Sequence, residues 1–185
     1  RTDICAKWTP NETFTYKILF VYVTDVVATV PSADNKDVVN IRYKMPKRER
    51  ALCELITEQM RVCMNELLDG LVKFEIDEYY TTQPVLSEDI CRIRDTNYVS
   101  AQNLSELQEL VKDYQCVITT CNFNDYESLS RDEAMVSTAK YATVFFENVV
   151  YDWVMNKNSW ETLFDPNIKY WEIIKNEYVD AILKG

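Results

Sequence analysis

Lys140–Trp160, KYATVFFENVVYDWVMNKNSW, is the longest run of the chain that combines a helical period with a strongly apolar face. Within it, Thr143–Asn156 has the pattern of a helix. Its apolar residues follow the spacing that places side chains on one face: Phe146, Val149, Val150, Trp153 and Val154. Polar residues form a stripe beside them: Glu147, Asn148, Tyr151 and Asp152. The pattern predicts a central helix that buries one face in the core.

The amino-terminal part of the chain predicts strands. Phe14–Thr24, FTYKILFVYVT, is rich in aromatic and β-branched residues and almost continuously apolar. This pattern is typical of a central strand buried on both faces. We expect Val26–Val30 to continue as strand, and Val38–Tyr43 to form another strand after the turn Pro31–Asp37.

A long helix follows this strand-rich part. It is predicted to begin at Pro46. The first N–H groups of a helix have no partner within the helix, so a proline, which has no N–H, suits this position. It ends near Asp69, where Gly70 can adopt the left-handed cap. Leu71–Thr82 then alternates apolar and charged residues, which predicts a half-exposed strand. Strand, helix and strand in this order predict a parallel β-α-β crossover.

The second half of the chain contains weaker patterns. Gln83–Ser100 is polar and is predicted as a loop, whereas Leu104–Tyr114 is predicted as a helix and Gln115–Thr120 as a strand. Cys121–Arg131 is predicted as an irregular loop, and a last helix is expected over Ile168–Leu183.

These elements predict an α/β (α+β) fold with a twisted mixed sheet, a backing helix, a central helix and a helical C-terminal part. We expect a single domain over residues 1–185. Residues 1–13 would form an arm, residues 14–140 the sheet and backing helices, and residues 141–185 the central helix and C-terminal helical part.

The composition indicates an acidic domain. The 185 residues carry 20 Lys and Arg against 30 Asp and Glu, a net charge of −10, and 47% are hydrophobic. This balance argues against nucleic acid backbones and anionic membrane surfaces, both of which attract clustered Lys and Arg. The apolar run Ile18–Val23 is too short to span a bilayer. We therefore expect neither a nucleic-acid partner nor membrane insertion.

The absence of histidine and the rarity of glycine exclude several kinds of active site and cofactor site. Histidine is absent, which removes Ser–His and Cys–His nucleophile pairs and imidazole metal ligands. The glycines are Gly70 and Gly185, so the chain has neither a P-loop nor a G-x-G-x-x-G dinucleotide motif. We expect no metal and no cofactor, and any catalysis would rest on carboxylates, Lys, Tyr or Cys.

The cysteines favour an exported protein. An even number without a C-x-x-C pair is typical of up to three disulfides, and the alternative is a set of buried free thiols in a reducing compartment. The six disulfide candidates are Cys5, Cys53, Cys63, Cys91, Cys116 and Cys121. Cys53 and Cys63 should not bridge each other, because ten helical residues rise about 15 Å. We expect secretion, with the pairing open.

Four stretches of the chain resemble secreted zincin-type metallopeptidases. They are ILFVYVTDVVATV (18–30), LLDGLVKFEIDEYYTT (67–82), ATVFFENVVYDW (142–153) and WEIIKNEYVDAILKG (171–185). The resemblance covers most of the chain. It implies the upper zincin subdomain, a twisted sheet that carries a backing helix and an active-site helix.

In that family the active-site helix carries H-E-x-x-H, whose two histidines bind zinc and whose glutamate is the general base. The chain has Phe146-Glu147-Asn148-Val149-Val150 at this position. Glu147 matches, but Phe146 and Val150 replace both zinc ligands and have no lone pair to offer a metal. The resemblance therefore implies a pseudo-peptidase that has kept the fold and lost the metal.

We expect from these features a secreted, non-catalytic domain that binds a protein or a glycan. The candidate binding residues are Tyr79, Tyr80, Glu147, Tyr151 and Asp152. Glu147 is also a weak catalytic candidate by position. Tyr79 and Tyr80 are neighbours on a strand, so one ring should lie on each face and one should be relatively exposed.

Two other functions remain open from the sequence. One is a carboxylate-based hydrolase that acts on polysaccharide, in which two acids flank the glycosidic bond. Its candidate acids are Asp25, Glu75, Asp77, Glu147 and Asp152. The other is a structural module of a larger extracellular protein.

Overall fold

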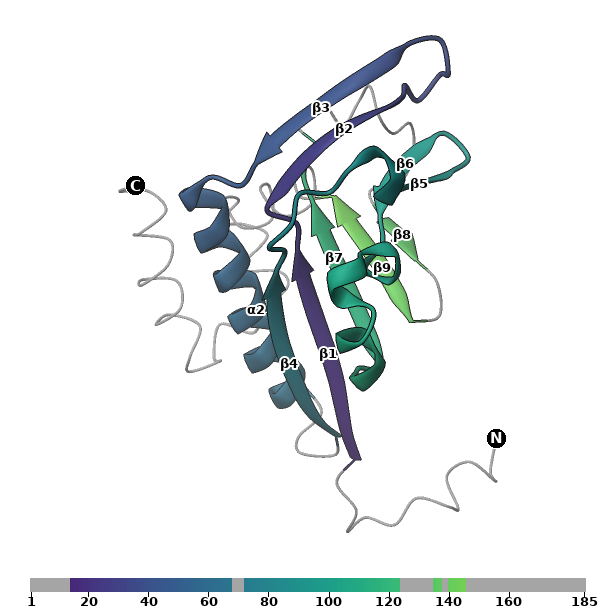
Figure 1. Ribbon diagram of the computed structural model, residues 1–185. Coiled ribbons are helices and arrows are strands. Elements are labelled where there is room, and N and C mark those ends of the chain that lie inside the picture. Colours follow the sequence, from purple (N-terminus) through teal and green to yellow (C-terminus); the bar gives the residue numbers. More distant parts are fainter. Residues whose placement is uncertain (1–13, 68–71, 124–134, 138–139, 146–185) are drawn as a thin grey trace, which may run out of the picture.

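The computed structural model describes residues 14–67, 72–123, 135–137 and 140–145 (Figure 1). Its main sheet has five strands in the order β4-β1-β7-β9-β8. They are β1 (Phe14–Tyr22), β4 (Val72–Tyr80), β7 (Cys116–Cys121), β8 (Met135–Ser137) and β9 (Tyr141–Phe145). The first four strands in the spatial order are parallel, and β8 runs antiparallel to β9. The predicted mixed sheet of an α+β fold is confirmed.

β1 lies near the centre of this sheet and is buried on both faces. Successive side chains of a strand point to opposite faces. Leu19, Val21 and Val23 belong to one hydrophobic cluster, and Ile18 and Phe20 belong to the other. None of these five side chains is more than 5% exposed, which confirms the prediction of a central strand.

α2 (Lys47–Leu67) covers one face of the sheet beside β1 and β4 (Figure 1). It begins directly after Pro46, as predicted. Cys53, Leu55 and Ile56 are buried in the cluster that this helix forms with the sheet. The strand that follows, β4, pairs in parallel with β1 from Phe14 opposite Val72 to Tyr22 opposite Tyr80. This confirms the parallel pairing across the helix, but the partner is β1, because β3, the strand directly before the helix, pairs with β2.

Between β1 and α2 the chain forms a separate antiparallel hairpin of β2 (Asp25–Pro31) and β3 (Val38–Lys44). The hairpin projects beyond the carboxyl ends of the sheet strands (Figure 1). Its inner residues, including Val26, Val30 and Ile41, join the core on the sheet face opposite α2. Both strands were expected, and β2 pairs outside the main sheet.

The segment from Gln83 to Tyr114 differs from its prediction. The expected loop contains a 3-10 turn, η1 (Ser87–Asp89), and a hairpin of β5 (Ile90–Ile93) and β6 (Thr96–Val99). The expected helix over Leu104–Tyr114 is wrong, because this part of the chain folds as short 3-10 turns. They are η2 (Ala101–Asn103), η3 (Ser105–Leu107) and η4 (Leu110–Asp113).

Apolar spacing explains why the prediction failed here. Leu104, Leu107 and Val111 are three and four residues apart, which suits an α-helix, and all three are buried in the core. Consecutive 3-10 turns with three residues per turn can direct the same side chains to the sheet. In the β5–β6 turn, Arg94 has a φ of 51°, a conformation that the sequence does not mark with glycine.

The predicted central helix is wrong over its first residues. Thr143, Val144 and Phe145 belong to β9, which pairs with β7 and β8. Their β-branched and aromatic side chains suit a strand. Residues 146–156 of that helix, the C-terminal helix and the arm of residues 1–13 lie outside the described residues, so these predictions stay open.

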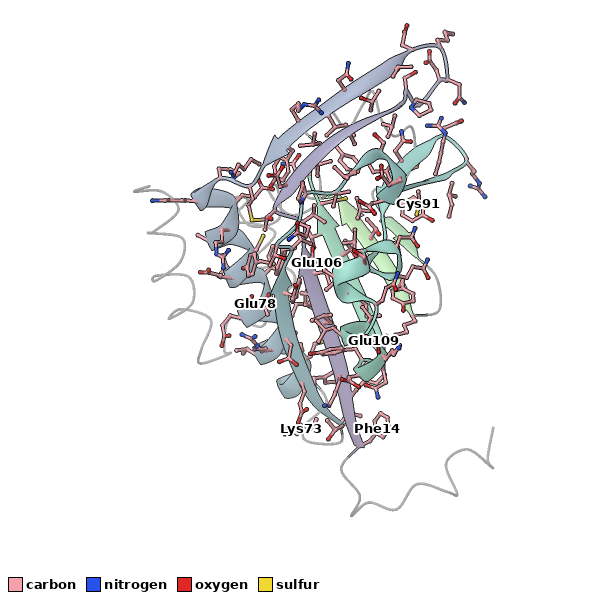
Figure 2. The ribbon with its side chains drawn as sticks, in the orientation of Figure 1. Phe14, Lys73, Glu78, Cys91, Glu106 and Glu109 are labelled. Atoms are coloured by element: carbon pink, nitrogen blue, oxygen red, sulfur yellow. The ribbon has the colours of Figure 1, made fainter. Side chains whose placement is uncertain are left out.

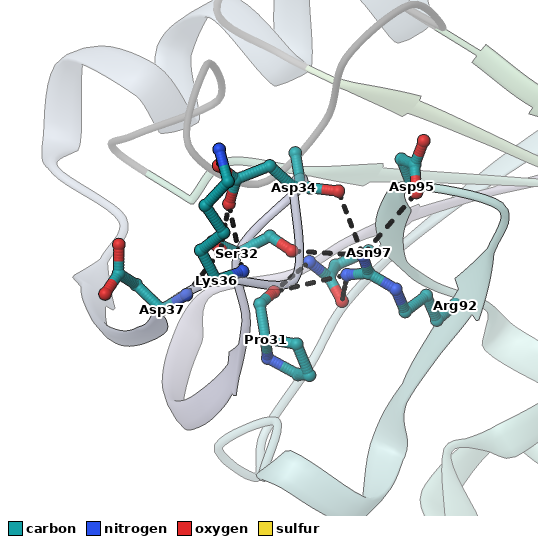
Figure 3. A network of polar contacts seen from close by, with 9 residues as sticks. Pro31, Ser32, Asp34, Lys36, Asp37, Arg92, Asp95 and Asn97 are labelled. Carbon is teal, nitrogen blue, oxygen red and sulfur yellow. Dashed lines mark hydrogen bonds and ion pairs between the residues drawn. The ribbon is translucent and has the colours of Figure 1, made fainter.

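Arg92 fastens the tip of the β2–β3 hairpin to the β5–β6 hairpin (Figure 3). Its guanidinium donates hydrogen bonds to the carbonyl oxygens of Pro31 at 3.2 Å, Ser32 at 3.0 Å and Ala33 at 3.2 Å. Asn97 donates to the Pro31 carbonyl at 2.9 Å and accepts a bond from Arg92 at 3.1 Å. This clamp holds the projecting hairpin in place over the sheet.

Candidate binding cleft at the carboxyl edge of the sheet

The carboxyl ends of β1, β4 and β7 meet at one edge of the sheet. β1 lies between the other two, and both pairs are parallel. Ligands of open α/β sheets bind outside the carboxyl ends of the strands, where neighbouring connections diverge. This edge is therefore the first place to look for a site.

Backbone and hydroxyl hydrogen bonds fix the strand ends relative to one another. Thr81 Oγ1 accepts a bond from the Thr24 amide at 2.9 Å, and Thr24 Oγ1 donates to the Thr81 carbonyl at 2.7 Å. The Thr81 amide donates to the Tyr22 carbonyl at 3.0 Å, and the Val23 amide donates to the Thr120 carbonyl at 3.1 Å. These bonds connect the ends of β1, β4 and β7.

A cleft of about 310 Å³ opens at this edge, and we call it the carboxyl-edge cleft. Its polar lining comes from Thr24, Asp25, Lys44, Lys47, Arg50 and Thr82. Met45, Pro46 and Pro84 supply the apolar walls. The corner between β1 and β2, the start of α2 and the end of β4 thus contribute side chains to one hollow.

Arg50 contacts two neighbouring side chains in this cleft. Its guanidinium carbon lies 3.8 Å from the centroid of the Tyr80 ring, within the range of a cation–π interaction. Its Nε lies 3.4 Å from a carboxylate oxygen of Glu54, one helical turn further on. The cation therefore contacts both an aromatic ring and a carboxylate.

Glu106 fastens η3 to the end of β4, beside the cleft (Figure 2). Its carboxylate accepts bonds from the Tyr79 hydroxyl at 3.1 Å, from the Thr82 hydroxyl and amide at 2.6 and 3.0 Å, and from the Gln83 amide at 3.4 Å. Partial burial raises the pKa of Glu106, but these hydrogen bonds outweigh it, so the pKa is lowered from 4.5. The sequence does not distinguish Glu106 from the other acidic residues.

Glu106→Gln is expected to lower the free energy of unfolding by about 1–2 kcal/mol at neutral pH, because the negative charge that strengthens these bonds is lost and the amide nitrogen cannot accept a bond at the second oxygen position. A carboxyl whose pKa is lowered on folding stabilises the protein above its ordinary pKa. The difference from wild type should therefore shrink as the pH falls below 4.5. Urea unfolding at neutral and acid pH measures it. Glu109→Gln is the control, because Glu109 contacts Lys112 on the surface; an equal loss there would contradict the assignment.

The structure places the two predicted tyrosines on opposite faces of β4, as expected. Tyr79 packs against one core cluster and donates to Glu106, whereas Tyr80 packs against the other and stacks on Tyr22 at a centroid distance of 5.2 Å. Both are half-buried, so the expected exposure of one ring is not observed. The other predicted binding residues, Glu147, Tyr151 and Asp152, lie outside the described residues.

Tyr22→Phe and Tyr80→Phe are expected to change the free energy of unfolding by different amounts, although the two rings are in contact. The Tyr22 hydroxyl is 2.9 Å from the Cys53 carbonyl and 2.7 Å from the Thr57 hydroxyl. The Tyr80 hydroxyl is buried and has no hydrogen-bond partner among the described residues. Tyr22→Phe should cost about 1–2 kcal/mol, and Tyr80→Phe should be neutral or stabilising. Thermal and urea unfolding of both variants test this; equal losses would contradict it.

Buried polar groups also lie where α2 meets the ends of β3 and β7. Glu49, in the first turn of α2, is 8% exposed and accepts a bond from the Asn122 amide at 3.3 Å. Burial, and then the Glu49 carboxylate, raise the pKa of the nearby Tyr43 hydroxyl. The burial of these residues could not be predicted from the sequence, because a charged residue in the first turn of a helix is ordinarily exposed to solvent.

The described cysteines Cys53, Cys91, Cys116 and Cys121 are free thiols. Burial raises the pKa of Cys121 to about 12 and also raises that of Cys53, so both thiols stay protonated and unreactive at neutral pH. Cys5 lies outside the described residues, as does the Cys63 side chain. The predicted disulfides stay a prediction.

Three candidate hydrolase acids, Asp25, Glu75 and Asp77, lie in the described part of the chain, and Glu75 and Asp77 are two residues apart on β4. Glu75 lies 2.7 Å from Lys73, whose hydrogen bond lowers the pKa of this carboxyl, whereas a glycosidase acid needs a raised pKa. Asp77 accepts a hydrogen bond from the Tyr114 hydroxyl at 2.8 Å. Among the described hydrolase candidates, Asp25 is the one that lines the carboxyl-edge cleft.

Within residues 14–67, 72–123, 135–137 and 140–145, no three His, Cys, Asp or Glu side chains are grouped to hold a metal. None of the described helices has the length and hydropathy that crossing a membrane requires.

Comparisons with known proteins do not assign the chain to a family. No protein-family model matches the sequence, and no curated protein matches it. No solved structure matches the fold. The zincin resemblance therefore stays a hypothesis.

Proposed function

We propose that this chain is a secreted, non-catalytic domain of the zincin type that binds a protein or glycan partner. The observation that carries the proposal is the pair Phe146 and Val150, which stand where the resemblance requires zinc ligands, in a chain without histidine. Glu147 keeps the position of the general base, but a base without a metal-bound water has nothing to activate.

Two features of the fold support the proposal. The resemblance implies a sheet with a backing helix, and α2 packs on the mixed sheet beside β1 and β4. The carboxyl-edge cleft supplies an open hollow for a ligand.

A protease assay tests the absence of catalysis. The purified chain, incubated with unfolded casein and added zinc, is expected to leave the substrate intact. Cleavage that a chelator abolishes would overturn the proposal.

A designed gain of metal tests the motif alignment itself. Phe146→His combined with Val150→His should gain zinc binding, because histidines one turn apart on a helix can chelate one ion. Phe146→His combined with Asn148→His is the matched control, since side chains two residues apart point away from each other on a helix. Equal zinc affinity of the two double variants, measured by titration calorimetry, would contradict the alignment.

A further inference from the structure

Basic residues are concentrated in one short segment of this acidic chain. Residues 42–50, RYKMPKRER, contain five basic residues and one acidic residue, a net charge of +4. The rest of the chain must then carry −14 to give the total of −10. Such a separation of charge favours encounter with an oppositely charged partner at one place.

The fold directs this segment into the carboxyl-edge cleft. Lys44 ends β3, Lys47 begins α2 and Arg50 lies one turn further along the helix, and all three line the hollow. Lys44 and Lys47 are exposed, and neither has a hydrogen bond or an ion pair within the described part of the chain. Two cations without a partner among the described residues thus lie next to a third, Arg50, that contacts Tyr80 and Glu54.

We infer that the carboxyl-edge cleft binds an acidic peptide segment of a partner protein. This inference rests on the proposed function and names the chemistry of its partner. Carboxylates of the peptide would pair with Lys44, Lys47 and Arg50. Asp25, which is the cross-strand neighbour of Lys44, can accept a backbone N–H through its carboxylate, and Met45, Pro46 and Pro84 can contact aliphatic parts of side chains.

Two observations favour a peptide over an anionic glycan. The side chains that line the cleft include no aromatic ring on which a sugar could stack, within the described residues. The basic segment is also short, and the remaining −14 of the chain would repel a long polyanion that extended beyond it. A short acidic stretch fits both constraints.

Fluorescence anisotropy with the full chain and a labelled peptide of alternating Glu and Ala tests the inference. Lys44→Gln combined with Lys47→Gln should weaken binding at least about tenfold, because two charge-assisted contacts are lost. The matched control is Lys36→Gln combined with Lys112→Gln, which changes the net charge equally at exposed lysines that contact Asp34 and Glu109. It should stay within about twofold of wild type, because exposed charges beyond a Debye length are screened.

Equal affinities of wild type and the cleft variant for the peptide would overturn the inference. The inference would also be overturned if the chain bound polygalacturonate more tightly than the peptide and the cleft variant lost this binding, because the ligand would then be a glycan. Mass spectrometry of the recovered peptide separates the two proposals. An intact peptide agrees with the non-catalytic function. A cleaved peptide overturns that function, and the affinities of wild type and the cleft variant then still test peptide binding in the cleft.

Discussion

Leu19→Ala is expected to lower the free energy of unfolding by about 3 kcal/mol, because it removes a buried side chain and leaves a cavity. Leu19 is 1% exposed and lies on the central strand, with β4 on one side and β7 on the other. The core around it joins the sheet to the β2–β3 hairpin and the 3-10 turns. Neighbouring elements cannot close the cavity without moving the sheet, so a value near the middle of the usual range is expected.

Phe14→Ala on the same strand is the control. Phe14 is 55% exposed at the amino end of β1 (Figure 2), and its loss should cost less than about 1 kcal/mol. Urea unfolding of both variants provides the comparison. A loss below 1 kcal/mol for Leu19→Ala, or equal losses for the two, would contradict the central position of this strand.

Leu107→Ala is expected to cost about 2–4 kcal/mol. Leu107 ends η3 and is fully buried in the core on the sheet face opposite α2. The 3-10 turns around it have few backbone hydrogen bonds of their own, so their position depends on side chains such as Leu104, Leu107 and Val111. Loss of Leu107 should therefore also loosen the turns.

Gln108→Ala tests whether burial or helix propensity dominates in this segment. Gln108 is exposed, and alanine is the better helix former, so the predicted α-helix would gain stability from this change. In the 3-10 structure the change should stay within about 0.5 kcal/mol. Urea unfolding and hydrogen exchange of the Leu104–Val111 amides measure both variants. Continuous protection of the Leu104–Val111 amides, as in an α-helix, would contradict the observed turns.

The strands with the strongest patterns could be predicted from the sequence. β1 is apolar almost throughout because both of its faces are buried. β4 alternates because Phe74 and Ile76 pack on the side of α2, whereas Lys73 and Asp77 on its other face are exposed. α2 has a proline directly before it and a regular apolar stripe. In these elements local propensity and tertiary burial agree, so a pattern in the sequence is enough.

The remaining elements could not be predicted, because their local sequence patterns fitted more than one structure or gave no signal. Thr143–Phe145 continues an apolar run that suits a helix, and only pairing with β7 and β8 makes it a strand. The β5–β6 hairpin turns at Arg94 rather than at a glycine. Its role in holding the β2–β3 hairpin depends on Arg92 bonding to carbonyls about sixty residues away, which no local pattern reports.

The candidate site was only partly predictable. The missing histidines and the position of Glu147 are properties of the sequence. The carboxyl-edge cleft depends on Lys44, Lys47 and Arg50 converging with Asp25 and Thr82, which come from four different elements or connections. The basic segment is visible in the sequence, but its opening into a hollow is a property of the fold.

Our central proposal is that this domain has a zincin-type architecture without the metal. Elemental mass spectrometry of the purified full chain, combined with melting temperatures with and without a chelator, tests it most directly. The account predicts less than stoichiometric zinc and an unchanged melting temperature, because no histidine is available and Phe146 and Val150 cannot bind a metal. One zinc per chain, with a melting temperature that falls on chelation, would contradict the account and return peptidase chemistry as the leading function.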